Sequence, residues 1–147
     1  MNNHENIHIP AGGPPDTTPP PTEIYQKMGK DGIFAMLSDF YLRLGDSEIK
    51  GMFPASRDAL MEASKKSAAF FVQICGGPMD YTSTYGPPRL RARHMPFEIR
   101  ENDKQVWLSC FFDVLSDAPN RYAFPLEHMD AFKSWLVAMA NWMVNRR

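Results

Sequence analysis

The fold is decided by the stretch Gly86-Pro87-Pro88-Arg89-Leu90-Arg91-Ala92-Arg93-His94-Met95-Pro96-Phe97. Pro88 suits the first turn of a helix, because proline lacks the N–H that this turn leaves unpaired. Pro96 disfavours helical geometry at Met95, so the helix should end near His94. The stretch therefore places a histidine in the last helical turn, beside three arginines. This imidazole is a candidate metal ligand, and the simpler interpretation is a histidine that the helix dipole stabilises.

On both sides of this stretch, apolar residues recur at helical spacing. Between positions 31 and 44 one helix face carries Ile33, Phe34, Leu37, Phe40, Tyr41 and Leu44. The same reasoning predicts helices over 23–28, 31–44, 56–75, 101–115 and 125–144, with a brief helical turn before Phe53-Pro54 and a loop over 79–87. No period-two pattern of strands is present in the sequence. The chain is therefore predicted to be all-α.

Residues 1–22 differ in composition from the rest of the chain. They hold six of the thirteen prolines and almost no large apolar side chains, which predicts an extended, disordered tail before a single domain over 23–147. A net charge of −1 gives no electrostatic case for nucleic acid or an anionic membrane as partner. We see no signal peptide and no apolar stretch of about 20 residues. Cys75 and Cys110 follow no metal or redox spacing, which favours reduced thiols and a cytoplasmic protein.

The histidines limit the choice of metal ligand. His4 and His8 lie in the tail, and His128 stands beside Glu127 at the start of the last helix, which leaves His94. No second ligand lies at the spacing of a zinc or di-iron site. A single protein ligand is not enough to hold a bare metal ion well. It is enough for a metal ion that the four nitrogens of a porphyrin already hold.

The same residues also have simpler interpretations. Arginines on a short helix usually form a solvated face. The side chains of Tyr41, Phe53 and Trp107 are typical core aromatics, whose polar atoms find backbone partners. The simpler interpretation of the two cysteines is that they are buried thiols rather than a redox switch.

Five blocks of sequence resemble one protein family. They are Asp39-Phe40-Tyr41, Met52-Phe53-Pro54, Gly76-Gly77-Pro78, the block from Tyr85 to Ile99 that contains His94, and Trp107-Leu108-Ser109-Cys110. In this order and spacing the chain resembles the truncated haemoglobins, specifically their second group, over about 24–146. The resemblance implies a shortened globin with two helices stacked over two others and haem b between them.

The resemblance also implies roles for individual residues. His94 matches the proximal ligand of the haem iron, and its other ring nitrogen should donate to a backbone carbonyl near Leu90. The positions that match ligand-stabilising residues on the opposite, distal side are Tyr41, Trp107, Ser67 and Ala63. The positions that match haem-contacting residues are Phe53, Lys66, Phe70, Phe71, Tyr81, Arg93 and Phe97, with Lys66, Tyr81 and Arg93 expected near the propionates.

The chain departs from the family pattern at three places. Gly29-Lys30 stands where the family has paired glycines, so the first helix corner should differ slightly. Phe53 stands where tyrosine is common, which removes one possible donor to the ligand. Pro87 replaces a frequent histidine, with little expected effect on chemistry.

Three functions remain open at this point. The first is a haem protein that binds O2, NO or CO, with high O2 affinity and slow release because Tyr41 and Trp107 can donate hydrogen bonds. The second is an NO dioxygenase or peroxidase-like enzyme, working with a separate reductase. The third is a haem-free helical interaction module. The sequence leaves the physiological ligand, the reductant and the choice between monomer and homodimer open.

Overall fold

The computed structural model describes residues 7–147, so positions 1–6 of the expected tail lie outside the described residues. The helices, in chain order, are α1 (Glu23–Gly45), η2 (Lys50–Met52), α2 (Arg57–Ile74), α3 (Asp80–Tyr85), α4 (Leu90–His94), α5 (Glu101–Leu115), α6 (Ala118–Tyr122), η3 (Leu126–His128) and α7 (Met129–Met143). The described residues contain no strand. The expected all-α fold is thereby confirmed.

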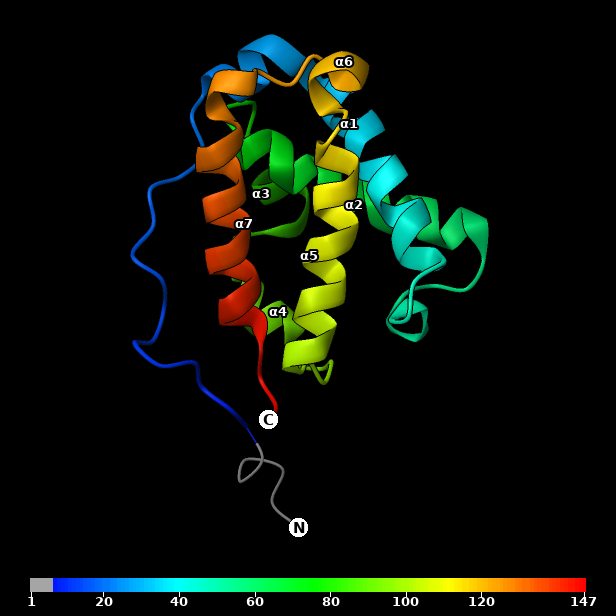
Figure 1. The fold of residues 1–147 in the computed structure, drawn as a ribbon, viewed down its shortest axis with the longest axis vertical. Coiled ribbons are helices and arrows are strands. Elements are labelled where there is room, and N and C mark those ends of the chain that lie inside the picture. Colours follow the sequence, from blue (N-terminus) through cyan, green and yellow to red (C-terminus); the bar gives the residue numbers. More distant parts are fainter. Residues whose placement is uncertain (1–6) are drawn as a thin grey trace.

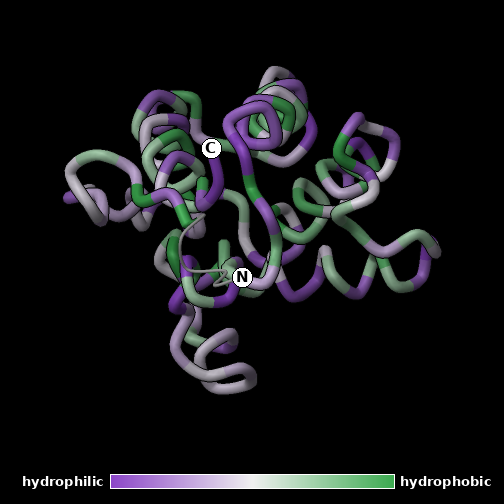
Figure 2. The backbone as a smooth tube through the Cα atoms, turned by 90° about the horizontal axis from the view of Figure 1, so that it is seen from below, coloured by the Kyte–Doolittle hydropathy of each residue, from purple (hydrophilic) through white to green (hydrophobic). Residues whose placement is uncertain are grey.

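The long helices form two pairs. α1 packs most extensively on α2, α5 packs on α7, and α1 also contacts α5. Figure 1 shows α5 and α7 side by side and running in opposite directions, with α1 and α2 crossing behind them. Polar and apolar positions alternate along the tube in Figure 2, as expected for helices that each bury one side. This is the two-over-two arrangement that the resemblance implies.

A single glycine divides α1 in two. Gly29 has φ 66° and ψ 177°, a conformation that only glycine adopts readily, and the helical segments on either side meet at this kink. The sequence predicts this break, because a helix over 23–28 and another over 31–44 leave Gly29 between them. The kink lets both segments bury apolar side chains, among them Ile24 and Phe40.

Helix α2 begins and ends where the sequence predicts. The Ser56 hydroxyl accepts a hydrogen bond of 3.2 Å from the Ala59 N–H, which satisfies one of the unpaired donors of the first turn. At the other end Gly76 has φ 99°, and the Gly77 N–H donates to the Val72 carbonyl. Gly76-Gly77-Pro78 therefore stops the helix in the expected manner.

We expect Ser56→Ala to lower the free energy of unfolding by about 1 kcal/mol, because the Ala59 N–H loses its partner. Urea unfolding of the two proteins measures the difference. Ser134→Ala is the matched control, since Ser134 is exposed inside α7 and alanine is the better helix former there. Equal destabilisation by both substitutions would contradict the capping role.

Two short helices were not predicted. Residues 79–87 were expected to be a loop, but Asp80–Tyr85 is helical, and Ala118–Tyr122 forms a further turn. Helices of five or six residues show too little periodicity to be detected in a sequence. Tertiary contacts hold the first of them in place, because the Gln73 side chain on α2 bonds both the backbone N–H and the hydroxyl of Thr82.

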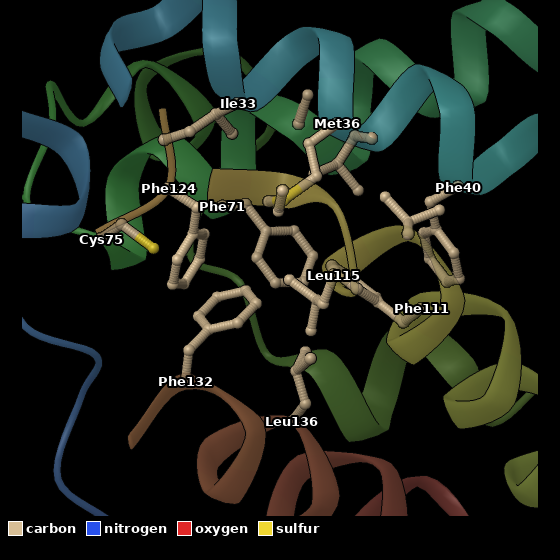
Figure 3. Close-up of a cluster of buried hydrophobic side chains, with 14 of the residues drawn as sticks. Ile33, Met36, Phe40, Phe71, Cys75, Phe111, Leu115, Phe124, Phe132 and Leu136 are labelled. Atoms are coloured by element: carbon tan, nitrogen blue, oxygen red, sulfur yellow. The ribbon is translucent and has the colours of Figure 1, made fainter. Parts of the chain in front are cut away.

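Aromatic side chains fill the space between the two helix pairs. Phe111 of α5 is fully buried and its ring lies 4.2 Å from that of Phe40, 5.5 Å from that of Phe71 and 5.8 Å from that of Phe132. Figure 3 shows these rings converging from different helices, with Cys75 at the edge of the cluster. Burying each such ring contributes roughly 1.5–3 kcal/mol. The phenylalanines of the sequence therefore serve largely as core.

The Cys75 thiol is buried, as the sequence analysis favours, and only 1% exposed. Burial raises the pKa of this thiol from 9.0 to about 12. Between these pH values the unfolded chain releases the thiol proton and the folded chain keeps it, so stability falls as pH rises above about 9. We expect Cys75→Ala to show a shallower loss of stability from pH 9 to 10.5, with a difference of at most about 1.4 kcal/mol per pH unit. Parallel curves in urea titrations would contradict this.

The sequence predicts an extended, disordered tail over 1–22, and residues 7–22 of it contain neither helix nor strand. Followed back from the start of α1, they run past α7 to the end of the molecule where the chain finishes (Figure 1). There the His8 N–H donates to the Asn145 carbonyl at 2.8 Å. α1 begins at Glu23, and the division of the chain at this point stays a prediction. Among the described helices, none combines the length and the hydropathy needed to cross a membrane.

Candidate functional site

A cavity of about 460 Å³ lies between the helix pairs. Every residue that the resemblance assigns to the site lines this cavity, and these are Tyr41, Phe53, Ala63, Lys66, Ser67, Phe70, Phe71, Tyr81, Arg93, His94, Phe97 and Trp107. They come from α1, the segment after η2, α2, α3, α4, the segment after it and α5. The structure thus brings together side chains spread over 67 positions of the chain, from 41 to 107.

His94 is the last residue of α4 and its ring is fixed by a local contact. Its Nδ1 lies 2.6 Å from the Leu90 carbonyl oxygen, the partner expected one turn earlier. Since a carbonyl only accepts, Nδ1 carries a proton, and in the neutral ring Nε2 then keeps its lone pair. The imidazole is half-buried at the cavity wall rather than solvated. This arrangement offers one neutral nitrogen as a ligand.

Tyr41 and Trp107 approach the cavity from α1 and α5. Phe40 packs edge-on against both, with ring centroids 5.7 Å from Tyr41 and 5.2 Å from Trp107, so one buried ring holds the two donors in place. Burial raises the pKa of the Tyr41 phenol, and the Ser67 hydroxyl, which can donate to the phenolate, opposes this shift. The phenol is therefore neutral at pH 7 and can donate a hydrogen bond.

The arginines of the stretch around His94 do not form one solvated face. Arg93 is half-buried, and its guanidinium donates to the carbonyls of Pro88 at 2.7 Å and Tyr85 at 2.7 Å. It also lies 5.5 Å from the centre of the Tyr81 ring. Arg91 points elsewhere and bonds backbone carbonyls outside the cavity. The solvated-face interpretation holds only for the exposed Arg89.

Sequence reasoning missed part of the wall. Helix α7 closes one side of the cavity with Trp135, Met139, Ala140 and Met143. The helical spacing over 125–144 predicts the helix but not its place at the cavity, because spacing alone does not tell a core contact from a cavity wall. The other missed lining residues are Ile49, Met52, Pro54, Leu90, Ile99, Asp103 and Lys104.

The chemistry of the lining fits haem. The walls are aromatic and aliphatic, as a flat apolar ring system requires, and one neutral imidazole nitrogen is available from His94. Lys66 and Arg93 place cations at the same cavity, where they can meet carboxylates. Within residues 7–147, no three side chains of His, Cys, Asp or Glu gather as ligands for a metal ion.

Comparison with known proteins points to one family. A family model described as bacterial-like globin matches residues 23–144. Group 2 truncated hemoglobin YjbI of Bacillus subtilis is 36% identical over 92 residues, which covers 62% of this chain and 67% of that protein. Two-on-two hemoglobin-3 of Arabidopsis thaliana is 29% identical over 100 residues, which covers 66% of this chain and 56% of the relative. The match thus spans little more than half of the plant protein.

Solved structures agree with the fold. Phosphate-bound Hell's gate globin IV superposes with a TM-score of 0.84 at 34% identity, covering 90% of this chain and 81% of its own. The group II truncated hemoglobin of Bacillus anthracis gives 0.73 at 31% identity, covering 83% and 90%. The truncated oxygen-avid haemoglobin of Bacillus subtilis gives 0.73 at 32% identity, covering 82% and 98%. The two-over-two fold expected from the sequence is the fold of these proteins.

Proposed function

Because the chain belongs to the bacterial-like globin family, as a group II truncated haemoglobin, we propose that it holds haem b through His94 and binds O2 tightly, with slow release. A globin of this kind carries haem and binds a small diatomic ligand such as O2. We propose, beyond this family property, the identity of the iron ligand, the affinity for O2 and the roles of the distal residues.

One observation carries the proposal. The His94 imidazole, with its Nδ1 held by the Leu90 carbonyl, lines the same cavity as the two hydrogen-bond donors Tyr41 and Trp107. Tight binding of a polar diatomic molecule requires a residue that ligates the iron and hydrogen-bond donors, all in one apolar cavity. The haem-free interaction module would need none of the three.

Each group has a defined task. When bound, haem would supply an iron that His94 could hold and that can bind a diatomic ligand. The Leu90 carbonyl keeps the proton on Nδ1, so that Nε2 remains a ligand and the ring keeps its orientation. The Trp107 indole N–H can only donate, and the neutral Tyr41 phenol can donate or accept. Two donors that line the same mainly apolar cavity would lower the energy of a ligand carrying partial negative charge.

The surrounding residues support the same assignment. Phe53, Phe70, Phe71 and Phe97 supply apolar contact, and Ala63 leaves space beside Ser67, one turn along α2. Lys66, Tyr81 and Arg93 are proposed to meet the propionates. Neither cysteine lines the cavity, which favours non-covalent haem b.

Slow release argues against simple O2 transport and favours turnover of O2 or NO. Such turnover needs electrons, so a separate reductase belongs to the proposal, as does a cytoplasmic location for a chain with reduced thiols. One solved relative is described as oxygen-avid, which supports high affinity here.

Absorption spectra test the proposal. The purified protein, supplied with hemin, is measured as isolated, after dithionite and after CO. We expect a Soret shift to the CO form of histidine-ligated ferrous haem. No uptake of hemin would overturn the proposal and leave the helical interaction module.

A further inference from the structure

The helix that carries His94 cannot hold its own orientation. α4 has five residues, no side-chain cap and no fully buried residue. A helix this short is unstable by itself in water. The Leu90 carbonyl that fixes the imidazole belongs to the same helix, so ring and carbonyl move together. The direction in which His94 points is therefore set by whatever fixes α4 to the rest of the fold.

One contact comes from the end of the chain. Asn145 is fully buried, and its side-chain Nδ2 donates to the Phe97 carbonyl at 2.9 Å and lies 3.4 Å from the His94 carbonyl. Its Oδ1 accepts from the Ile99 N–H at 2.9 Å. A single side-chain amide thus contacts the carbonyl of His94, the last residue of α4, and bonds Phe97 and Ile99 in the segment that follows.

A second contact comes from α4 itself. The Arg91 guanidinium donates to the carbonyls of Trp142 and, at 3.0 Å, Val144, and it lies 4.5 Å from the centre of the Trp142 ring. Its other terminal nitrogen donates to the His8 carbonyl at 2.8 Å. Arg91 therefore ties α4 to the end of α7 and to the N-terminal extension.

We propose that Asn145 and Arg91 are positioning residues for the His94 imidazole. Together they form a brace that holds α4 against the C-terminal segment and sets where the imidazole meets the cavity. Neither residue lines the cavity, so both act only through α4. The inference rests on the proposed function, in which His94 is the iron ligand.

The polar character of these side chains is what the brace uses. An apolar residue at position 145 would be buried equally well, but it would leave the Ile99 N–H and the Phe97 carbonyl without partners. Five backbone carbonyls converge on the two side chains, from residues 8, 94, 97, 142 and 144. These carbonyls belong to three separate parts of the chain. Such a cluster specifies one orientation of α4 rather than merely covering it.

The test compares Arg91→Ala and Asn145→Ala with Arg89→Ala, an exposed arginine next to the same helix. The first measurement is haem loss to an excess of an acceptor apoprotein. The second is the iron–histidine stretching band of the ferrous protein by resonance Raman spectroscopy. Changes to residues that orient a metal ligand typically cost 10–100-fold in metal affinity. We expect haem loss to be about 10-fold faster in both variants, and the band to shift or broaden, with Arg89→Ala unchanged.

Conservative variants separate positioning from folding. Arg91→Lys keeps the charge but offers one nitrogen in place of a fork, so it should restore only part of the wild-type behaviour. Should Asn145→Ala fail to fold, Asn145→Asp keeps the acceptor for the Ile99 N–H and loses the donors. A merely structural role would lower the melting temperature of the variants and leave the vibrational band where it is. That outcome, or haem loss within twofold of Arg89→Ala, would overturn the proposal.

A measurement without haem keeps the two proposals apart. In the apoprotein, the amides of Arg93 and Phe97 bond carbonyls of residues 89 and 94, so their hydrogen exchange reports on α4 and its end. We expect exchange at least about 10-fold faster in Arg91→Ala than in Arg89→Ala. If haem uptake fails in the wild type but this difference is present, the proposed function is wrong and the brace still holds α4. If haem uptake is normal and exchange is equal, only the brace is wrong.

Discussion

His94→Ala is expected to abolish stable haem binding, with retention weakened by more than about 100-fold, because the substitution removes the proximal ligand itself rather than a residue that orients it. The CO form of the ferrous protein should lose the spectrum of histidine-ligated haem. Adding free imidazole should restore that spectrum, since the small ligand can enter the space that the side chain leaves. Absorption titrations with hemin, with and without imidazole, measure both effects.

His128→Ala is the control for this substitution. His128 lies at the start of α7, away from the cavity, with its ring 3.9 Å from the Glu23 carboxylate. Its loss should leave haem binding and the CO spectrum unchanged. If His94→Ala retained haem as well as the wild type does, and imidazole had no effect, another residue would be the ligand and the proximal assignment would be wrong.

The second large effect concerns the release of O2. Hydrogen bonds to a charged or strongly polarised acceptor contribute roughly 1.5–3 kcal/mol each. Since about 1.4 kcal/mol corresponds to a factor of ten, we expect Trp107→Phe and Tyr41→Phe each to speed O2 dissociation by about 10–100-fold. Both substitutions keep an aromatic ring in contact with Phe40, so the packing of the wall is preserved. Stopped-flow measurement of O2 displacement gives the rates.

CO supplies the internal control for these two variants. CO is a weaker hydrogen-bond acceptor than O2, so its dissociation should change much less than that of O2 in both variants. Phe112→Leu, at a half-buried site of α5 outside the cavity, should leave both rates unchanged. O2 release at the wild-type rate in both distal variants would show that neither Tyr41 nor Trp107 stabilises the ligand.

The parts of the fold that the sequence predicts are those with repeated local signals. About three turns of apolar spacing, from Ile33 to Leu44, predict the second segment of α1, and Ser56 and Gly76 mark the ends of α2. The correct bounds of α5 follow from the same spacing. α3 and α6 have no such repetition, and α3 is held by Gln73 at a distance of nine residues, so a scan for periodicity passes over both.

The candidate site was predictable for a different reason. The resemblance gave twelve of its lining residues, six of them inside the matched blocks and six at aligned positions between the blocks. The structure places these twelve around one cavity, whereas the wall that α7 supplies was not predicted. The brace was not found, because Asn145 bonds groups 46 to 51 positions away and an asparagine near a chain end gives no local signal. Arg91 was likewise grouped with Arg89 and Arg93 as one solvated face. Only the fold shows that Arg91 and Arg93 point to different partners.

The position of Asn145 also sets an order of events during synthesis. The amide that holds the end of α4 follows His94 by 51 residues. At about 5–20 residues per second, a ribosome adds this residue roughly 3–10 s after the histidine. During that interval the nascent chain contains His94 but lacks the Asn145 amide that orients its imidazole. Haem is therefore expected to bind only after the last helix has been translated. Haem that reaches the growing polypeptide earlier would find His94 not yet held in its final orientation.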